Sequence, residues 1–227
     1  AGARGLIWCF LMRRRSSPRW LLVFVVLGSF LTVALLGPSL AEVGGSNARE
    51  PAHPPAFRGA GDDAAFASLQ SRFLSLLSEF VAIPSVSNDA AHSDDVERAF
   101  EWLFRVAERC GAATGFRTVA VDGTDRKFAK IAIGPEDASA VVAVYAHLDV
   151  QPAGEWEGGD AFALRPAAGG RLTGRGVADD KAPLLTWLLA AADLHSRGEL
   201  RAKVKFLVEG AEEAGSPGLE AAVAAEA

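Results

Sequence analysis

The sequence predicts an α/β protein, an α/β/α sandwich built on a mixed, mostly parallel sheet. Short apolar runs, typical of buried strands, alternate with longer segments whose apolar residues recur every three to four positions. Three short motifs that carry acidic residues, at 146–150, 176–181 and 209–214, are also separated by about one βα unit of chain. Because such a unit returns the chain to the same edge of a sheet, this even spacing supports the fold class.

Composition limits what these motifs can mean. The 227 residues are 50% hydrophobic and 22% charged, which is enough apolar material for a sizeable core. The net charge of −5 is opposite in sign to that of typical nucleic-acid-binding domains, so we expect no nucleic-acid partner. The two cysteines, Cys9 and Cys110, predict no disulfide framework. Neither a G-x-S-x-G nucleophile elbow nor a phosphate loop with its Lys and Ser/Thr occurs, which argues against serine hydrolases and nucleotide-binding enzymes.

The N-terminal segment is typical of a leader sequence. Residues 1–11 precede the single methionine, Met12, and we interpret them as upstream read-through or non-native sequence. Residues 12–41 contain an arginine cluster, an apolar core and a small-residue ending, which predict a signal peptide cleaved after Ala41. The alternative is an uncleaved signal anchor, because the apolar run of about 17 residues at 20–36 reaches the lower limit for spanning a bilayer. Either form directs the protein to the secretory pathway, secreted or membrane-anchored.

The next segments are a linker and two helices. Residues 42–63 are predicted to be a disordered linker, because they are rich in glycine and proline and almost free of large apolar side chains. Two amphipathic helices follow, at 66–80 and 96–107, each with an apolar stripe that we expect to face the core. The stripe of the first helix consists of Phe66, Leu69, Phe73, Leu76, Leu77 and Phe80.

Strands are predicted at 116–121, 127–133, 140–145 and 204–208. A helix over 182–197, with Pro183 in its first turn, lies between the last two strands, and Ser216-Pro217 open a further helix. The first acidic motif directly follows the strand at 140–145, and the third follows the strand at 204–208. Both motifs therefore lie at the carboxyl ends of strands, where open α/β sheets place their sites.

The residue types in these motifs indicate a metal site. His147 offers one imidazole, and Asp179, Glu212 and Glu213 offer carboxylates. Nitrogen and oxygen ligands without thiolates suit Zn²⁺, Mn²⁺ or a related divalent ion, and a catalytic site keeps one coordination position open for water. Asp149 is placed to accept the other ring proton of His147 and thereby fix its tautomer. Asp179 is a candidate bridging carboxylate for two cations.

Glu212 and Glu213 are neighbours, so in a regular strand their side chains would face opposite ways. Both can reach one cleft only if the chain leaves the pleat there, which the glycines and proline of 215–218 permit. One glutamate could then bind metal while the other takes a proton from water. Taken singly, each motif is more often structural: a satisfied histidine, a cap for the next helix or a solvated turn. Their joint occurrence at strand ends favours the metal site.

Three segments, 145–152, 170–183 and 209–219, resemble the di-zinc metallopeptidases that include carnosinases, cytosolic non-specific dipeptidase, carboxypeptidase S and the acetylornithine deacetylase group. Gln151-Pro152 and Asp179-Asp180-Lys181 are most similar to the carnosinase and dipeptidase branch. The resemblance extends from about Phe66 to the C-terminus. It implies a zinc-exopeptidase-like catalytic domain that hydrolyses a dipeptide with two divalent metal ions, Zn²⁺ or Mn²⁺.

The resemblance also implies a role for each site residue. His147 would bind one metal, Asp179 would bridge both, and Glu213 would bind the other. Glu212 would be the general acid/base and Asp149 would support His147. In such enzymes a metal-bound hydroxide attacks the scissile carbonyl, and the glutamate passes its proton to the leaving amine.

The sequence departs from the family pattern near the pocket wall and not at the ligands. Ala146 and Ala182 stand where the family usually has glycine, and residues 156–162 lack the family's Asp-Pro-Phe ending and are one residue longer. We therefore expect the substrate preference to differ more than the chemistry. Two alternatives share these motifs: an N-acyl amino acid hydrolase of the same family, and a non-catalytic membrane-anchored ectodomain.

The family takes further ligands from outside this chain, a carboxylate shortly beyond position 227 and a distant histidine, and it adds a lid and dimerisation domain. We therefore expect residues 64–227 to be the N-terminal part of the catalytic domain of a larger homodimeric enzyme, called the full-length protein below. On the same grounds we expect the 227-residue chain alone to be inactive and to bind metal weakly.

Overall fold

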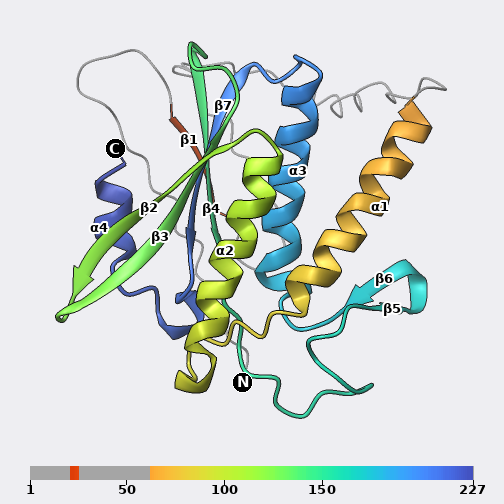
Figure 1. Cartoon of the computed structure of the whole chain (residues 1–227), viewed down its shortest axis with the longest axis vertical. Coiled ribbons are helices and arrows are strands. Elements are labelled where there is room, and N and C mark those ends of the chain that lie inside the picture. Colours follow the sequence, from red (N-terminus) through yellow and green to blue (C-terminus); the bar gives the residue numbers. More distant parts are fainter. Residues whose placement is uncertain (1–20, 26–61, 227) are drawn as a thin grey trace, which may run out of the picture.

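The sheet at the centre of the fold has five strands in the order β1-β4-β7-β3-β2 (Figure 1). This computed structural model describes residues 21–25 and 62–226. β4 is parallel to β1 and to β7, whereas β3 is antiparallel to β7 and to β2. The predicted α/β class with a mixed sheet is confirmed, and the pairings divide evenly between parallel and antiparallel. The strands are β1 (Leu21–Val25), β2 (Ala113–Val121), β3 (Thr124–Ile133), β4 (Ala140–His147) and β7 (Ala202–Glu209).

The hairpin of β2 and β3 forms the antiparallel side of the sheet. Its turn is Asp122-Gly123, and these residues have φ angles of 49° and 75°. Positive φ at both central residues gives a turn whose twist matches the flanking strands, and Asp-Gly is a preferred sequence for it. β3 is longer than its predicted run because its polar residues 124–126 pair with β2 beside the turn, and β2 is longer because residues 113–115 pair with 130–132 of β3 at the other end of the hairpin.

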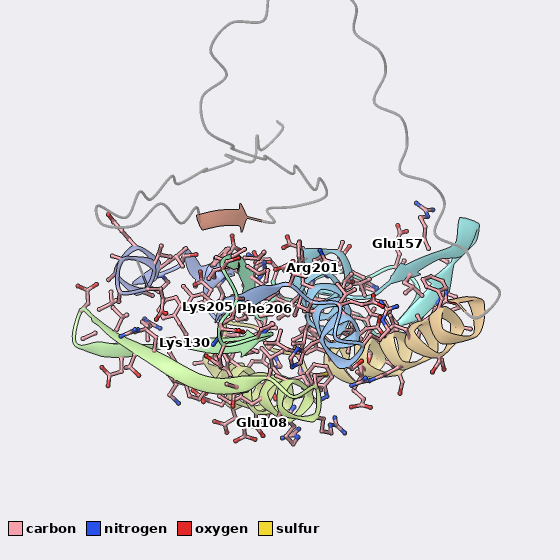
Figure 2. All side chains as sticks on the ribbon, turned by 90° about the horizontal axis from the view of Figure 1, so that it is seen from above. Glu108, Lys130, Glu157, Arg201, Lys205 and Phe206 are labelled. Atoms are coloured by element: carbon pink, nitrogen blue, oxygen red, sulfur yellow. The ribbon has the colours of Figure 1, made fainter. Side chains whose placement is uncertain are left out.

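Three helices cover one face of the sheet: α1 (Asp62–Val81), α2 (Ser93–Arg109) and α3 (Ala182–Ser196). Seen from above, they lie on one side of the sheet, and the short α4 (Leu219–Ala224) lies on the other (Figure 2). All four predicted helices are therefore present. The remaining elements are the small hairpin β5 (Arg165–Ala167) and β6 (Arg171–Thr173) and the short helical turns Ala90–His92, Ala168–Gly170, Val177–Lys181 and Glu212–Ala214.

The hydrophobic core lies between the sheet and α1, α2 and α3. Phe80 of α1 stacks on Trp102 of α2 with ring centroids 4.4 Å apart, which joins the two helices. The predicted apolar stripes face this core, with one correction: Phe66 is 66% exposed. The burial of α1 begins at Leu76, so the first turns of the helix extend past the core. Fully buried core residues include Leu77, Phe80, Leu103, Leu184, Leu185, Leu188 and Val208.

The N-terminal predictions fall mostly outside the described residues, which leave out 1–20 and 26–61. Residues Leu21–Val25, predicted to belong to the apolar core of a signal peptide or anchor, are paired in the structure with β4 as a parallel edge strand. An apolar run of this kind satisfies the requirements of a strand as well as those of a leader. No helix in the described part of the chain is long and apolar enough to span a membrane. Of the linker predicted at 42–63, only Asp62 and Asp63 are described, and both belong to α1.

Candidate metal centre

The candidate site lies at the carboxyl ends of β4 and β7, at the lower end of the sheet in Figure 1. His147 is the last residue of β4 and is paired in register with Glu209, the last residue of β7. The chain leaves both strands together, and the N–H of Leu148 donates to the carbonyl of Glu209 at 2.9 Å. Because parallel neighbours end at the same edge, the first and third motifs meet there, as the sequence predicted.

His147 is the centre of the cluster and is only 2% exposed. Its Nε2 lies 2.9 Å from Oδ1 of Asp179 and 4.0 Å from Oε2 of Glu212. The structure therefore brings one residue from each of the three motifs together around a single ring nitrogen. The side chain of Asp179 is 59% exposed, so this nitrogen faces the solvent side of the site.

The other ring nitrogen of His147 faces Asp149. Nδ1 is 3.1 Å from the backbone carbonyl of Asp149 and 3.5 Å from its carboxylate Oδ1, so the carbonyl is the nearer partner. The sequence had led us to expect the carboxylate in this position. The carboxylate instead accepts hydrogen bonds from the backbone N–H groups of Glu212 and Glu213, at 3.1 and 3.0 Å, and from Oγ of Ser87 at 2.5 Å. These three donors explain how an anionic side chain can be fully buried.

Glu212 and Glu213 lie in a short helical turn, Glu212–Ala214, and not in the strand. The predicted departure from the pleat is thus present, and it ends in a left-handed residue, Gly215, with φ of 93°. Just before the turn, Gly210 passes close to α2: a Cβ there would lie 2.8 Å from Val96 and 2.9 Å from Phe100. The turn can pack against α2 in this way only because position 210 has no side chain.

The second motif forms the turn Val177–Lys181 in front of α3. Asp180 is 2% exposed, and its Oδ2 accepts a hydrogen bond from the N–H of His147 at 3.2 Å. Lys181 is fully buried, and its Nζ donates to the carbonyls of Phe80 and Ile83 at 2.9 and 2.7 Å. No side chain of the turn caps α3, so the alternative of a simple helix cap is not supported. The turn is instead tied to β4 and to the end of α1.

Several residues that contact the site lie outside the set predicted to bind metal or move protons. Nδ2 of Asn88 donates to the carbonyl of Glu213 at 2.7 Å, and Nε2 of Gln151 donates to the Glu213 carboxylate at 2.8 Å. Ser87 and Asn88 lie in the loop between α1 and α2, more than sixty residues from their partners. Gln151, Asp180 and Lys181 were part of the motifs, but spacing alone did not indicate what they would contact.

Electrostatics set the protonation of the cluster. Burial would lower the pKa of His147, but hydrogen bonds to Asp149 and Asp179 raise it to about 11. The same bond to His147 lowers the pKa of Asp179 despite its partial burial. Burial raises the pKa of Asp180 to about 7, and burial also raises the pKa of Glu212. Without a cation these interactions favour a proton on His147, and a bound metal ion would take the place of that proton.

The residue types around His147, an imidazole and carboxylates, suit a divalent cation. The 2.9 Å between His147 Nε2 and Asp179 Oδ1 is a hydrogen-bond distance, shorter than the roughly 3.4 Å between two atoms bound to one tetrahedral Zn²⁺ at about 2.0–2.2 Å. Within residues 62–226, however, no three His, Cys, Asp or Glu side chains are grouped closely enough to hold a metal ion. The described residues thus supply a ligand pair together with neighbouring carboxylates, not a closed coordination sphere.

Known proteins resemble this chain in sequence. Residues 143–227 match the family described as Peptidase family M20/M25/M40. A Cys-Gly metallodipeptidase of Schizosaccharomyces pombe is 34% identical over 168 residues, which are 70% of this chain and 35% of that protein. The human Beta-Ala-His dipeptidase is 33% identical over 168 residues, 66% of this chain and 32% of that protein. The chain thus spans about a third of the length of these relatives.

Solved structures show the same likeness. The dipeptidase Dug1p of Saccharomyces cerevisiae superposes with a TM-score of 0.64 at 26% identity, over 70% of this chain and 36% of that one. Human carnosine dipeptidase 1 superposes with a TM-score of 0.63 at 30% identity, over 73% of this chain and 38% of that one. The resemblance inferred from the three motifs is therefore confirmed at the level of the family and the fold.

Proposed function

We propose that the full-length protein is a metal-dependent dipeptidase, because residues 143–227 match peptidase family M20/M25/M40. The observation that carries the proposal is the convergence of His147, Asp179 and Glu212, one residue from each motif, at the carboxyl edge of the sheet. Relatives over most of this chain are named as a Cys-Gly metallodipeptidase and a Beta-Ala-His dipeptidase, which supports a dipeptide as the substrate class.

The residues that would hold the metal are His147, Asp179 and Glu213. Asp179 has two carboxylate oxygens and is the residue proposed to bridge two divalent ions, with Zn²⁺ as the typical metal of such sites. When bound, these ions would polarise the scissile carbonyl and lower the pKa of water to near neutrality. The ring of His147 is oriented for this role by its contact with Asp149: Nδ1 faces Asp149, so Nε2 is directed at Asp179.

Glu212 is proposed as the general acid/base. Its side chain is 27% exposed, so it can reach both solvent and the cluster, and its Oε2 is 4.0 Å from His147 Nε2. Burial raises the pKa of this carboxyl, which favours accepting a proton from water and returning it to the leaving amine. The N–H of Glu212 is bound to Asp149, which keeps the residue beside the cluster. A proton transfer of this kind contributes about 10²- to 10⁴-fold in rate.

Location and assembly are part of the same proposal. The leader-like residues 12–41 support entry into the secretory pathway, with a secreted product if cleavage follows Ala41 and a membrane-anchored one if residues 20–36 are kept. The full-length protein is proposed to form a homodimer, in line with the resemblance stated above. Dipeptide substrates need no further macromolecular partner.

The experiment that tests the proposed function is a substrate panel. The purified full-length protein is assayed with dipeptides and with N-acyl amino acids, before and after chelation and after re-addition of Zn²⁺ or Mn²⁺. We expect dipeptide hydrolysis that is lost on chelation and restored by metal. Hydrolysis of N-acyl amino acids alone would assign the protein to the deacylating branch. If the metal-bound protein hydrolyses neither class of substrate, the protein is a non-catalytic ectodomain.

A further inference from the structure

We propose that Gln151 is a positioning residue that holds the side chain of Glu213 in its metal-binding orientation. The inference rests on the proposed function, in which Glu213 is a metal ligand. Nε2 of Gln151 donates to Oε2 of Glu213 at 2.8 Å and lies 3.3 Å from the carbonyl oxygen of the same residue. Within residues 62–226, no other side chain donates a hydrogen bond to this carboxylate.

The placement of Gln151 follows from the first motif. It comes two residues after Asp149, with Val150 between them in a parallel bridge to Val86, and both side chains contact Glu213. Glu213 lies in the turn Glu212–Ala214. Asp149 binds the backbone N–H of Glu213 at 3.0 Å, and Gln151 binds its carboxylate. The segment after β4 therefore controls both the position of the Glu213 backbone and the direction of its side chain.

An amide is suited to this task for electrostatic reasons. Its N–H occupies one carboxylate oxygen and leaves the other free for a cation, while the glutamate keeps its full negative charge. A lysine or arginine at position 151 would place a positive charge beside the bound cation, and an aspartate or glutamate would repel Glu213. The hydrogen bond also restricts rotation about the last torsion of Glu213, which is otherwise broad.

Asn88 provides a matched control. Its Nδ2 donates to the carbonyl of Glu213 at 2.7 Å and makes no hydrogen bond to the carboxylate. Replacing Asn88 by alanine removes one support of the turn and leaves the side chain of Glu213 in contact with Gln151. A comparison of the two positions therefore separates the orientation of the carboxylate from general support of the backbone.

The test is the Zn²⁺ affinity of the full-length protein, measured by competition with a chelator. We expect Gln151→Leu to lower the affinity by about 10- to 100-fold, the usual effect of losing a residue that orients a ligand. Gln151→Met, which also lacks the amide donor, should lower it by a similar factor, and it decides the case if the leucine variant does not fold. Asn88→Ala should have a much smaller effect. Thermal unfolding of the metal-free proteins should be the same for all these variants, and excess Zn²⁺ should restore activity by mass action.

The outcomes distinguish the two levels of the proposal. If Gln151→Leu and Gln151→Met keep the wild-type affinity while Glu213→Gln loses it, the role of Gln151 is refuted and the proposed function stands. Equal losses in Asn88→Ala and Gln151→Leu would also refute it, because support of the turn would then explain both. If the wild-type protein binds no Zn²⁺, or Glu213→Gln binds it normally, both proposals fall.

Discussion

The buried carboxylate of Asp149 accepts a hydrogen bond from the backbone N–H of Glu213 at 3.0 Å. This bond links the segment that follows β4 to the turn that follows β7, and these two strands are adjacent and parallel. The same carboxylate accepts from the N–H of Glu212, so both glutamates of the third motif are positioned by one residue of the first. Asp149 thus sets where the two glutamates lie relative to His147.

Asp149→Asn should disrupt the site while changing little in shape. An asparagine offers one acceptor oxygen to the three donors that now bind Asp149, and its NH₂ group would face an N–H. We expect the full-length variant to lose about 10- to 100-fold in metal affinity, with a parallel loss in kcat. Metal content after dialysis and steady-state kinetics measure this. The exposed Asp137→Asn is the control, and a normal metal content in Asp149→Asn would contradict the prediction.

Glu212→Gln and Glu213→Gln should fail in different ways although the residues are neighbours. Glu212 is proposed to move a proton without holding metal, so Glu212→Gln should keep a near wild-type metal content and lose about 10²- to 10⁴-fold in kcat. Glu213→Gln removes a charged ligand, so it should lower the metal occupancy. Excess Zn²⁺ or Mn²⁺ should restore part of the activity of Glu213→Gln and none of that lost in Glu212→Gln.

Metal analysis beside turnover separates these two assignments. If Glu212→Gln is the variant that loses metal and is rescued by it, the roles of the two glutamates are reversed. If neither variant changes metal content or turnover, neither residue belongs to the site.

Lys181→Met should lower the free energy of unfolding. The methionine has a similar length but leaves the carbonyls of Phe80 and Ile83 without their buried donor, which costs about 1–3 kcal/mol. Urea unfolding of the full-length protein measures the loss. Lys205→Met, at an exposed position of β7, is the matched control and should stay within about 0.5 kcal/mol of wild type. A destabilisation no larger than that of the control would mean that Lys181 does not secure the end of α1.

Lys181 should also contribute to the pH dependence of stability. Burial lowers the pKa of its ammonium group from 10.5 to about 7 in the folded protein. Between pH 7 and 10.5 the unfolded chain binds more protons at this group than the folded chain does. The group therefore makes the free energy of unfolding increase as pH rises above 7 and decrease again as pH falls toward 7. Unfolding free energies at pH 7, 8 and 9 should rise more steeply in wild type than in Lys181→Met. Parallel profiles would show that Lys181 keeps its proton in the folded state.

The N-terminal segment yields a prediction that decides between two roles for Leu21–Val25. In the structure these residues pair with β4, whereas cleavage after Ala41 would remove them from the mature protein. Expressed from Met12 in a secretory host, the protein is expected to be cleaved at or near Ala41, and intact-mass measurement tests this. A mature product that keeps these residues in the membrane fraction would establish the anchor, and one that keeps them outside that fraction would favour the strand.

Much of the fold could be predicted from the sequence because its determinants are local. Apolar runs at 140–145 and 204–208 are strands in the structure, and the three-to-four periodicity of the helices places their stripes on the core. The position of the site could also be predicted. His147 and the Glu212–Glu213 pair directly follow two strands, and the carboxyl ends of neighbouring parallel strands must meet at one edge.

Only the tertiary structure decided which atoms hold these groups in place. Asp149 binds the third motif through the backbone of Glu212 and Glu213, and Ser87 and Asn88 reach the site from a loop far away in the sequence. Such contacts depend on how three segments pack, and neither periodicity nor spacing encodes that packing.

The same limit applies to Leu21–Val25, which the sequence predicts to be part of a leader and which pair with β4 in the structure. Hydrophobicity records that a segment avoids water. It does not indicate whether the segment leaves water by entering a membrane, by serving as a signal peptide or by pairing with the edge of β4. For this protein, the sequence determined the residue types of the candidate site and their place on the sheet, and the packing of the chain decided the contacts that orient them.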